Sequence, residues 1–118
     1  MKIVNFKIFN LHAEFCKVLS NPKRLMIIAL LSKKDMCVGD IAKATDTALA
    51  TISQHLRVLR EQHIVNTKKD GQVVFYSLAD PDLMKASVII RRVLLKSMYI
   101  RGTIAREIDP EGVSLDDK

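Results

Sequence analysis

The hydrophobic pattern of this chain changes its period after residue 62, and this change restricts the fold more than any other feature. Residues 48–62 carry apolar side chains at helical spacing, which predicts a helix with one buried face. These apolar positions are Ile52, Leu56 and Leu59. Two segments with strand-like alternation follow, 64–69 and 72–78, and they flank Asp70-Gly71, a strong signal for a hairpin turn. A helix followed directly by a two-stranded ribbon is therefore expected.

Two helices are predicted near the start of the chain. Residues 5–19 carry an apolar stripe at helical spacing, formed by Phe6, Phe9, Ala13 and Cys16. Asn21 is a suitable N-cap, and Pro22 suits the first position of a helix that should span about 22–32. This second helix is apolar nearly all round, which predicts a central place in the core.

A helix-turn-helix can be traced through the middle of the sequence. Residues 38–44 can form a short helix with Ile41 directed inward, and residues 45–47 form a turn rich in capping side chains. The longer helix at 48–62 follows at once, and its second face is small and polar. This arrangement describes a helix-turn-helix, and the hairpin after it makes a winged helix. The predicted fold class is thus mainly α, with a two-stranded β-wing.

The last predicted helix runs from Asp82 to about Arg106. One side of it carries Leu83, Ala86, Ile90, Val93, Leu94 and Ser97, with basic residues between them. Gly102 is expected to end or weaken this helix, because glycine is a poor helix former.

Charge divides the chain into a basic body and an acidic end. The chain has 19 Lys and Arg residues and 13 Asp and Glu residues, a net charge of +6. Residues 1–106 hold 18 of the basic and 8 of the acidic residues, a net charge of +10. Such a body favours a polyanionic partner, although a merely soluble basic surface has the same balance. We expect one winged helix-turn-helix domain at 1–106 and an acidic, flexible tail at 107–118.

The sequence argues against several protein classes. No apolar segment approaches the ~20 residues of a membrane-spanning helix, and the N-terminus shows no signal-peptide cleavage site. Two cysteines cannot form a disulfide framework, which fits a reducing cytoplasm. No Gly-rich phosphate loop, HExxH helix or nucleophile elbow is present, so an enzyme is not expected.

Three segments together resemble the ArsR/SmtB family of winged-helix repressors. They are SNPKRLMIIALLS, DMCVGDIAKATDTALATISQHLRVLREQHIV and KKDGQVVFYSLAD, within a matched region from about Phe15 to Asp80. Residues 51–59 match the recognition helix of that family, and residues 71–78 match its wing. The resemblance implies a homodimer that pairs through the first and last helices and binds a pseudo-palindromic operator. It also implies repression that a ligand relieves.

The resemblance and the side-chain chemistry point to one set of DNA-binding residues. Ser53, Gln54 and Arg57 are hydrogen-bond donors on the polar face of the helix, and Gln54 could bond adenine bidentately. Arg60 and the two wing lysines would meet phosphates. The full candidate set is Thr47, Leu49, Ala50, Thr51, Ser53, Gln54, Arg57, Arg60, Lys68 and Lys69. A solvated helix face is the alternative interpretation of Ser53 and Gln54.

The start of the recognition helix departs from the family pattern. Small polar residues such as Ser-Gln-Ser are usual there, but this chain has Ala48-Leu49-Ala50. Capping is therefore expected from Asp46 or Thr47. Leu49 offers only an apolar contact, for example to a thymine methyl, so specificity is expected to be modest or to depend on DNA shape. These residues also favour an alternative function, a protein-interaction module that has lost DNA binding, which the basic body opposes.

No standard metal-sensing site and no cofactor are expected. Metal-responsive members of the family carry Cys-x-Cys before the turn, where this chain has Cys37-Val38-Gly39. A second family site, on the last helix, falls here on Asp80, Asp82, Val93 and Lys96. Valine has no ligand atom and the lysine ammonium repels a cation, so a zinc site is not predicted there.

A less standard thiol or metal sensor is kept as an alternative. His12 and Cys16 share a face of the first helix, and Cys37 would join them if it packed nearby. The opposing interpretation makes Cys16 a core residue that continues the apolar stripe. The resemblance places His55 at a position that packs between helices, and His63 ends a helix, where a positive ring suits the dipole. Neither histidine is predicted to be a ligand, and the inducer is not predicted.

Overall fold

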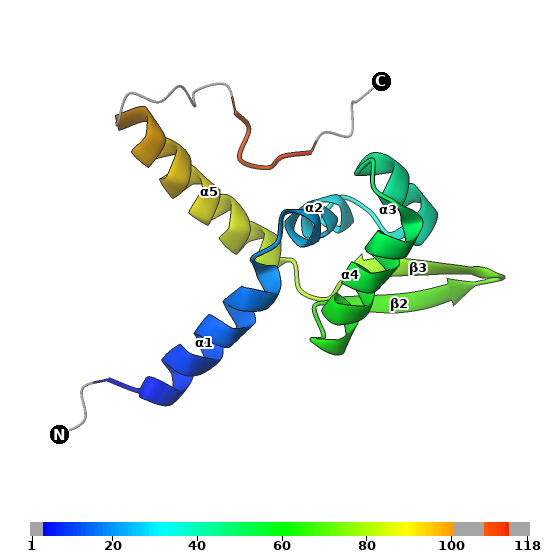
Figure 1. Ribbon diagram of the computed structural model, residues 1–118, viewed down its shortest axis with the longest axis horizontal. Coiled ribbons are helices and arrows are strands. Elements are labelled where there is room, and N and C mark those ends of the chain that lie inside the picture. The colour runs from blue at the N-terminus through cyan, green and yellow to red at the C-terminus, as the bar shows by residue number, and fades with distance from the viewer. Residues whose placement is uncertain (1–3, 101–107, 114–118) are drawn as a thin grey trace.

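The computed structural model describes residues 4–100 and 108–113. It has a helical body with a β-hairpin, and two helices extend from this body (Figure 1). The elements are α1 (Phe6–Leu19), α2 (Pro22–Leu31), β1 (Met36–Cys37), α3 (Val38–Ala44), α4 (Leu49–Glu61), β2 (Val65–Asp70), β3 (Val73–Leu78) and α5 (Asp82–Ile100). The body consists of α2, α3, α4 and the sheet, whereas α1 and α5 extend away from it on one side. Among the described residues, no helix has the length and apolar character needed to cross a membrane.

Asparagine side chains start the first two helices. Asn21 Oδ1 accepts hydrogen bonds from the backbone N–H groups of Lys23 at 2.9 Å and Arg24 at 3.2 Å, and Pro22 occupies the first turn of α2. Asn5 caps α1 in the same way. The predicted start of α2 is confirmed, and such a cap contributes about 1 kcal/mol to stability.

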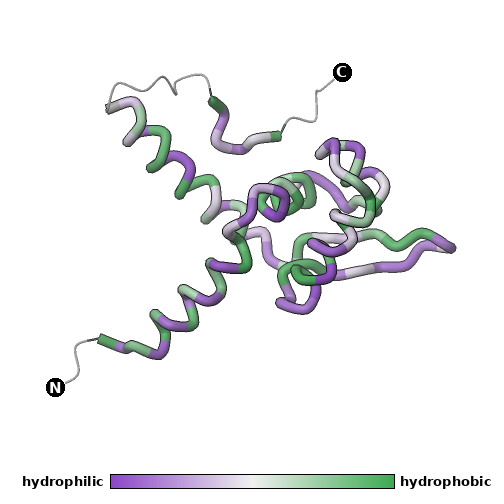
Figure 2. The backbone as a smooth tube through the Cα atoms, in the orientation of Figure 1, coloured by the Kyte–Doolittle hydropathy of each residue, from purple (hydrophilic) through white to green (hydrophobic). Residues whose placement is uncertain are grey.

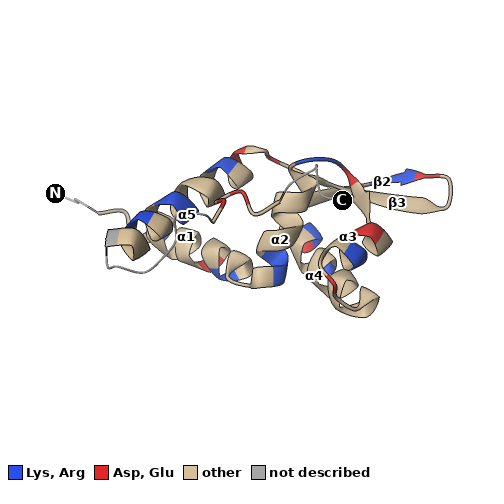
Figure 3. Cartoon of the chain, turned by 90° about the horizontal axis from the view of Figure 1, so that it is seen from above, with Lys and Arg blue, Asp and Glu red and all other residues tan. Residues whose placement is uncertain are grey.

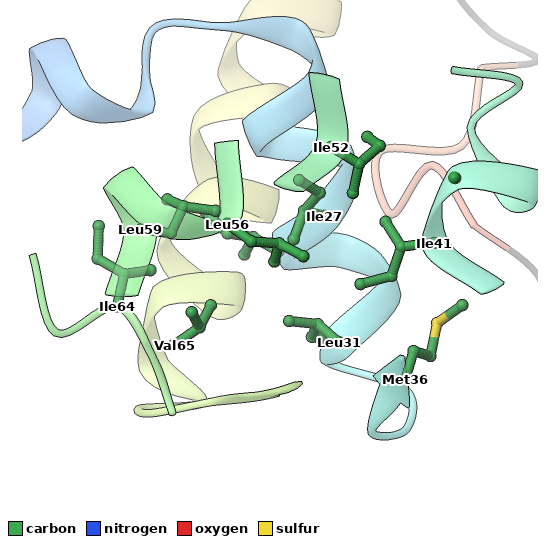
Figure 4. Packing of buried hydrophobic residues seen from close by; sticks show 11 residues of the cluster. Ile27, Leu31, Met36, Ile41, Ile52, Leu56, Leu59, Ile64 and Val65 are labelled. Carbon is green, nitrogen blue, oxygen red and sulfur yellow. The ribbon is translucent and has the colours of Figure 1, made fainter. Parts of the chain in front are cut away.

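One cluster of apolar side chains joins α2, α3, α4 and the sheet (Figure 4). Its fully buried members are Ile27, Ile28, Ile41, Ile52, Leu56, Leu59 and Val65. The two isoleucines of α2 confirm that this helix is central. The three members from α4 are those predicted from the helical spacing. Burial of this face leaves the opposite face of α4 to solvent.

The sheet has three strands, one more than predicted. Its order is β1-β3-β2, and both strand pairs are antiparallel. Met36 and Cys37 form all of β1 and pair with Tyr76 and Phe75 of β3. A strand of two residues is too short to show an alternating pattern, so the sequence contained no signal for it.

The hairpin turn lies one residue later than predicted. Asp70 pairs with Val73 and belongs to β2, which leaves Gly71 and Gln72 as the two loop residues. Gly71 has a φ of +64°, as the first loop residue of a type II′ turn requires. The Asp-Gly pair thus indicated the hairpin correctly but placed the turn one position too early.

Hydrophobic residues recur along both extending helices (Figure 2), and many of their large side chains are exposed. No residue of α1 is fully buried. Cys16 is only half-buried, so within one chain it is not a core residue, contrary to that interpretation. The large exposed side chains include Phe6, Phe9, Leu11 and Phe15 on α1 and Ile89, Ile90, Val93 and Leu94 on α5. On its other side α5 buries Met84, Ser87 and Val88.

The described residues near the end of the chain lie against α2 and α5. Arg91 Nη1 donates a hydrogen bond to the carbonyl oxygen of Pro110 at 2.9 Å. Lys33 Nζ donates to Glu111 Oε1 at 2.6 Å and forms an ion pair with it. The predicted continuation of the last helix over residues 101–106, with its end at Gly102, lies outside the described residues.

Candidate nucleic-acid interface

The exposed face of α4 carries the predicted base-reading side chains. Ser53, Gln54 and Arg57 are exposed, whereas the opposite face of this helix is fully buried. Together with Ala50 and Thr51 they line an open groove of about 500 Å³. A row of small and polar residues allows a nucleic-acid groove to approach the backbone closely and offers donors to it. The structure thus brings these five predicted residues onto one accessible surface.

The start of α4 has no side-chain cap, so the predicted capping by Asp46 or Thr47 is wrong. Ala48 is the N-cap residue, and no side-chain hydrogen bond reaches the first turn. Thr47 Oγ1 instead donates to the carbonyl oxygen of Thr45 at 2.8 Å. The backbone N–H groups of the first turn therefore lack an internal side-chain acceptor, and a phosphate group can take that place. Leu49, at the same end, is 55% exposed.

Asp46 cannot cap α4 because it terminates α3. Its φ is +49°, and its N–H donates to the carbonyl oxygen of Lys43 at 3.2 Å. The next N–H, of Thr47, donates to the carbonyl oxygen of Ala42 at 3.0 Å. These two bonds form a Schellman motif, which satisfies the last carbonyls of α3 and fixes the turn into α4.

The wing presents a lysine on each of its faces. Lys68 pairs with Phe75, and Lys69 pairs with Val74, in the register between β2 and β3. Successive side chains of a strand point to opposite faces, so the two exposed ammonium groups are expected on opposite sides of the ribbon. Figure 3 shows the basic part of β2 close to the tip of the hairpin. Exposed Asp70 follows them at the tip and partly offsets their charge.

His55 lies between α2 and α4, as predicted. The Nε atom of Arg24 donates to His55 Nδ1 at 3.2 Å. Burial lowers the pKa of His55 below its ordinary value, and the positive charges of Arg24 and Lys23 lower it further. The lowered pKa favours the neutral ring, whose Nδ1 accepts the hydrogen bond from Arg24 and so joins α4 to α2.

The candidate sensor residues do not form a site within the chain. His12 is exposed on α1, Cys16 is half-buried at the far end of that helix, and Cys37 is half-buried in β1. In residues 4–100 and 108–113, no three His, Cys, Asp or Glu side chains are placed to hold a metal ion together.

Sequence reasoning missed one basic residue near the start of α4. Lys43, in the last turn of α3, is exposed and lines an open hollow of about 660 Å³ with Thr47, Ala48 and Leu49. Lys43 could have been identified from the sequence, because it is a basic residue at the end of the first helix of the predicted helix-turn-helix. Arg60 is also exposed, in the last turn of α4.

Comparison with known proteins agrees with this geometry. Residues 21–67 match the family model described as bacterial regulatory protein, arsR family. The HTH-type transcriptional regulator Rv0081 of Mycobacterium tuberculosis is 33% identical over 107 residues, which cover 89% of this chain and 93% of that protein. This chain belongs to the ArsR family. A SmtB repressor homologue of Synechocystis is 39% identical over 72 residues, which cover 61% of this chain and 54% of that relative.

Solved structures of ArsR-type regulators share the fold. The crystal structure of Rv0081 aligns with a TM-score of 0.74 at 33% identity and covers 81% of this chain and 97% of that one. A homodimeric winged helix-turn-helix DNA-binding domain of Mycobacterium bovis, Mb0332, gives a TM-score of 0.66 at 26% identity and covers 81% and 87%. The predicted family, the winged helix-turn-helix fold and the class of DNA-binding transcriptional regulator are confirmed.

Proposed function

We propose that this ArsR-family chain is a cytoplasmic homodimeric repressor that places α4 in the major groove of a duplex operator. The observation that carries this proposal is the division of α4 into two faces. Ile52, Leu56 and Leu59 are fully buried, and the face with Gln54 and Arg57 is open beside the basic wing. A helix held in this way can enter the groove without loss of core packing.

The chemistry of each candidate residue allows a role at the duplex. Gln54 pairs with adenine, and Ser53 and Arg57 donate to base edges or phosphates within the same groove. Leu49 contacts a thymine methyl group. Arg60, Lys68 and Lys69 neutralise phosphates, and Thr47, Ala50 and Thr51 lie where the backbone approaches the duplex.

The second copy is proposed to cover the apolar faces of α1 and α5. Phe6 is 71% exposed, Ile90 is 66% exposed and Val93 is 62% exposed, so these faces leave much apolar surface in water. Large exposed apolar patches mark interaction surfaces. The homodimeric state of the similar Mycobacterium bovis domain supports pairing of identical chains. A two-fold dimer then binds two half-sites about 34 Å apart.

The signal that ends repression is proposed to differ from the standard metal sites of the family. Gly39 stands where Cys-x-Cys members have their second thiol, and Val93 and Lys96 stand at two positions of the other metal site. Neither glycine nor valine supplies a ligand atom, and lysine repels a cation.

Selection of duplexes from a random pool, followed by a salt titration, tests the proposed function. We expect an enriched two-fold sequence and an affinity that falls steeply with salt, with a log–log slope of about −0.9 for each phosphate neutralised. Binding that is negligible for every duplex, at low salt as well, would contradict the proposal and favour a protein-interaction module. Binding without any enriched sequence would contradict the role of α4 in base readout.

A further inference from the structure

A further surface hollow, separate from the two beside α4, lies between the end of α2 and the first half of α5. Its volume is about 530 Å³, and its walls combine apolar side chains with three basic side chains. We propose that this cavity binds a small amphipathic carboxylate, an anion with an acyl or aromatic body. The inference goes beyond the proposed function, because the cavity shares no residue with the surface of α4.

The apolar part of the cavity comes from one side of α5. Met84 and Val88 are each 8% exposed and form its inner wall, while Ile89, at 56% exposed, forms its rim. A ligand body laid on these side chains would remove apolar surface from water on both partners, which is the usual main contribution to small-molecule binding.

The basic part of the cavity supplies the site for a carboxylate. Lys33, Lys85 and Arg92 line the same cavity. Lys85 pairs with Asp82 at 3.6 Å, but both side chains are more than 70% exposed, and such a pair is weak. Arg92 makes no ion pair within the residues that the structure describes. An arginine beside a lysine is a common arrangement for binding carboxylates, because its planar group can donate two parallel hydrogen bonds.

The chain itself already places one carboxylate in this cavity. Glu111 lines it, and its Oε1 lies 2.6 Å from Lys33 Nζ, with the two side chains 46% and 29% exposed. The segment is held by the hydrogen bond from Arg91 to Pro110, and Val113 packs near Met84 and Val88. Glu111 thus shows that the cavity accepts a carboxylate, and an external ligand must compete with it.

Calorimetric titration of the full-length chain with octanoate tests the proposal, with octan-1-ol and acetate as matched probes. Octanol keeps the apolar body without the charge, and acetate keeps the charge without the body. We expect one octanoate per chain and an affinity at least about tenfold higher than that of either control, because one charge-assisted contact is equivalent to roughly that factor. Equal affinity for octanol, or several octanoates per chain, would overturn the proposal.

Four variants locate the binding in this cavity. Lys33→Gln and Arg92→Gln should each weaken octanoate binding by about fivefold or more, because each removes one charged donor. Lys34→Gln and Lys96→Gln remove neighbouring exposed charges outside the cavity and should leave the affinity within about twofold. Unchanged affinity in both cavity variants, or equal losses in the control variants, would contradict the site.

One further variant tests the competition with the chain's own carboxylate. Glu111→Gln should tighten octanoate binding by about threefold, because it removes the internal anion from Lys33. Circular dichroism of every variant checks that the fold is kept. An affinity that falls in Glu111→Gln would mean that Glu111 helps to hold the ligand, and it would overturn the competition.

Discussion

Arg24 donates a hydrogen bond from Nε to Nδ1 of His55 at 3.2 Å, and this contact joins α2 to α4. The same guanidinium donates from Nη1 to the carbonyl oxygen of Val18 in α1 at 3.0 Å. Arg24 therefore connects three helices at the inner side of the proposed DNA-reading element. Because Nδ1 accepts a hydrogen bond from Arg24 and must keep its lone pair to do so, the contact requires the neutral ring of His55.

The stability of the fold is expected to fall in weak acid through His55. Burial and the charges of Arg24 and Lys23 lower the pKa of His55 in the folded chain below its unfolded value. Between the two values the unfolded chain binds more protons, so this contribution is complete above about pH 6.5 and decreases as pH falls through the folded pKa. Urea unfolding at about pH 8 and about pH 5.5 should show the loss.

The variant His55→Asn separates this effect from other sources of pH dependence. Asparagine keeps an acceptor near Arg24 but does not titrate. The variant should lose less free energy of unfolding between the two pH values than the unsubstituted chain does. His12→Asn, at an exposed position of α1, controls for the removal of a histidine far from Arg24. An equal loss in His55→Asn and the unsubstituted chain would refute the role given to His55.

A glycine at position 63 is expected to stabilise the chain. His63 has a φ of +60°, and its N–H donates to the carbonyl oxygen of Arg60, while that of Ile64 donates to Leu59. These bonds form a Schellman motif whose left-handed residue is normally glycine, so His63→Gly should raise the free energy of unfolding by about 1 kcal/mol. Gln62→Gly is the control, because Gln62 has a φ of −90° and gains nothing from glycine. A destabilised His63→Gly variant in urea unfolding would contradict this.

Truncation of the exposed donors of α4 should weaken binding to the selected operator and leave the fold intact. Gln54→Ala and Arg57→Ala are each expected to cost about 1–3 kcal/mol in binding and to relax the preference at one base pair. Their melting temperatures should stay near that of the unsubstituted chain, because both side chains are exposed. Lys34→Ala removes an exposed charge elsewhere as control. Fluorescence anisotropy measures the affinity, and a collapse of the melting temperature would contradict the placement of either residue.

Removal of both wing lysines should weaken binding to all duplexes equally. The double variant Lys68→Ala/Lys69→Ala loses two exposed charges in each chain, four in the proposed dimer, so the log–log salt slope should become smaller by about 3.6. Affinities for the operator and for an unrelated duplex, measured over a salt series, check this prediction. A change in sequence preference with an unchanged slope would show that the wing reads bases.

A charge placed on the apolar face of α5 should produce a monomer. Ile90→Glu puts a carboxylate where the second copy is proposed to pack, and burial of an unpaired charge costs several kcal/mol. Sedimentation should then show a single chain that keeps its helical content, and operator affinity should fall strongly. Asp35→Lys, which changes the charge of an exposed loop residue, should stay dimeric. A dimeric Ile90→Glu variant would place the interface elsewhere.

The sequence predicted the helices and the buried face of α4 because both follow from periodic side-chain patterns. Ile52, Leu56 and Leu59 recur at helical spacing, and each is fully buried. The periodic pattern could not predict which of two neighbouring helix ends a turn residue would stabilise. Asp46 has the chemistry of an N-cap for α4, but the backbone places it in the left-handed position that terminates α3.

Contacts between segments far apart in the sequence could also not be predicted from periodic patterns. The strand at Met36 and Cys37 forms only because β3 offers a free edge to it. The pairing of Lys33 with Glu111 joins residues far apart in the sequence that no motif connects. The candidate DNA-reading residues could be named because the family resemblance aligns each of them with a position of the recognition helix or the wing. Composition and spacing alone do not provide this alignment.

Methylation interference on the selected operator tests the central claim, that α4 reads the major groove in two half-sites. Methyl groups on guanine N7 project into the major groove, and those on adenine N3 project into the minor groove. We predict that major-groove methylation blocks binding in two clusters, about 34 Å apart along the duplex, and that Arg57→Ala weakens part of this pattern. Binding that is indifferent to every major-groove methyl group would contradict the account.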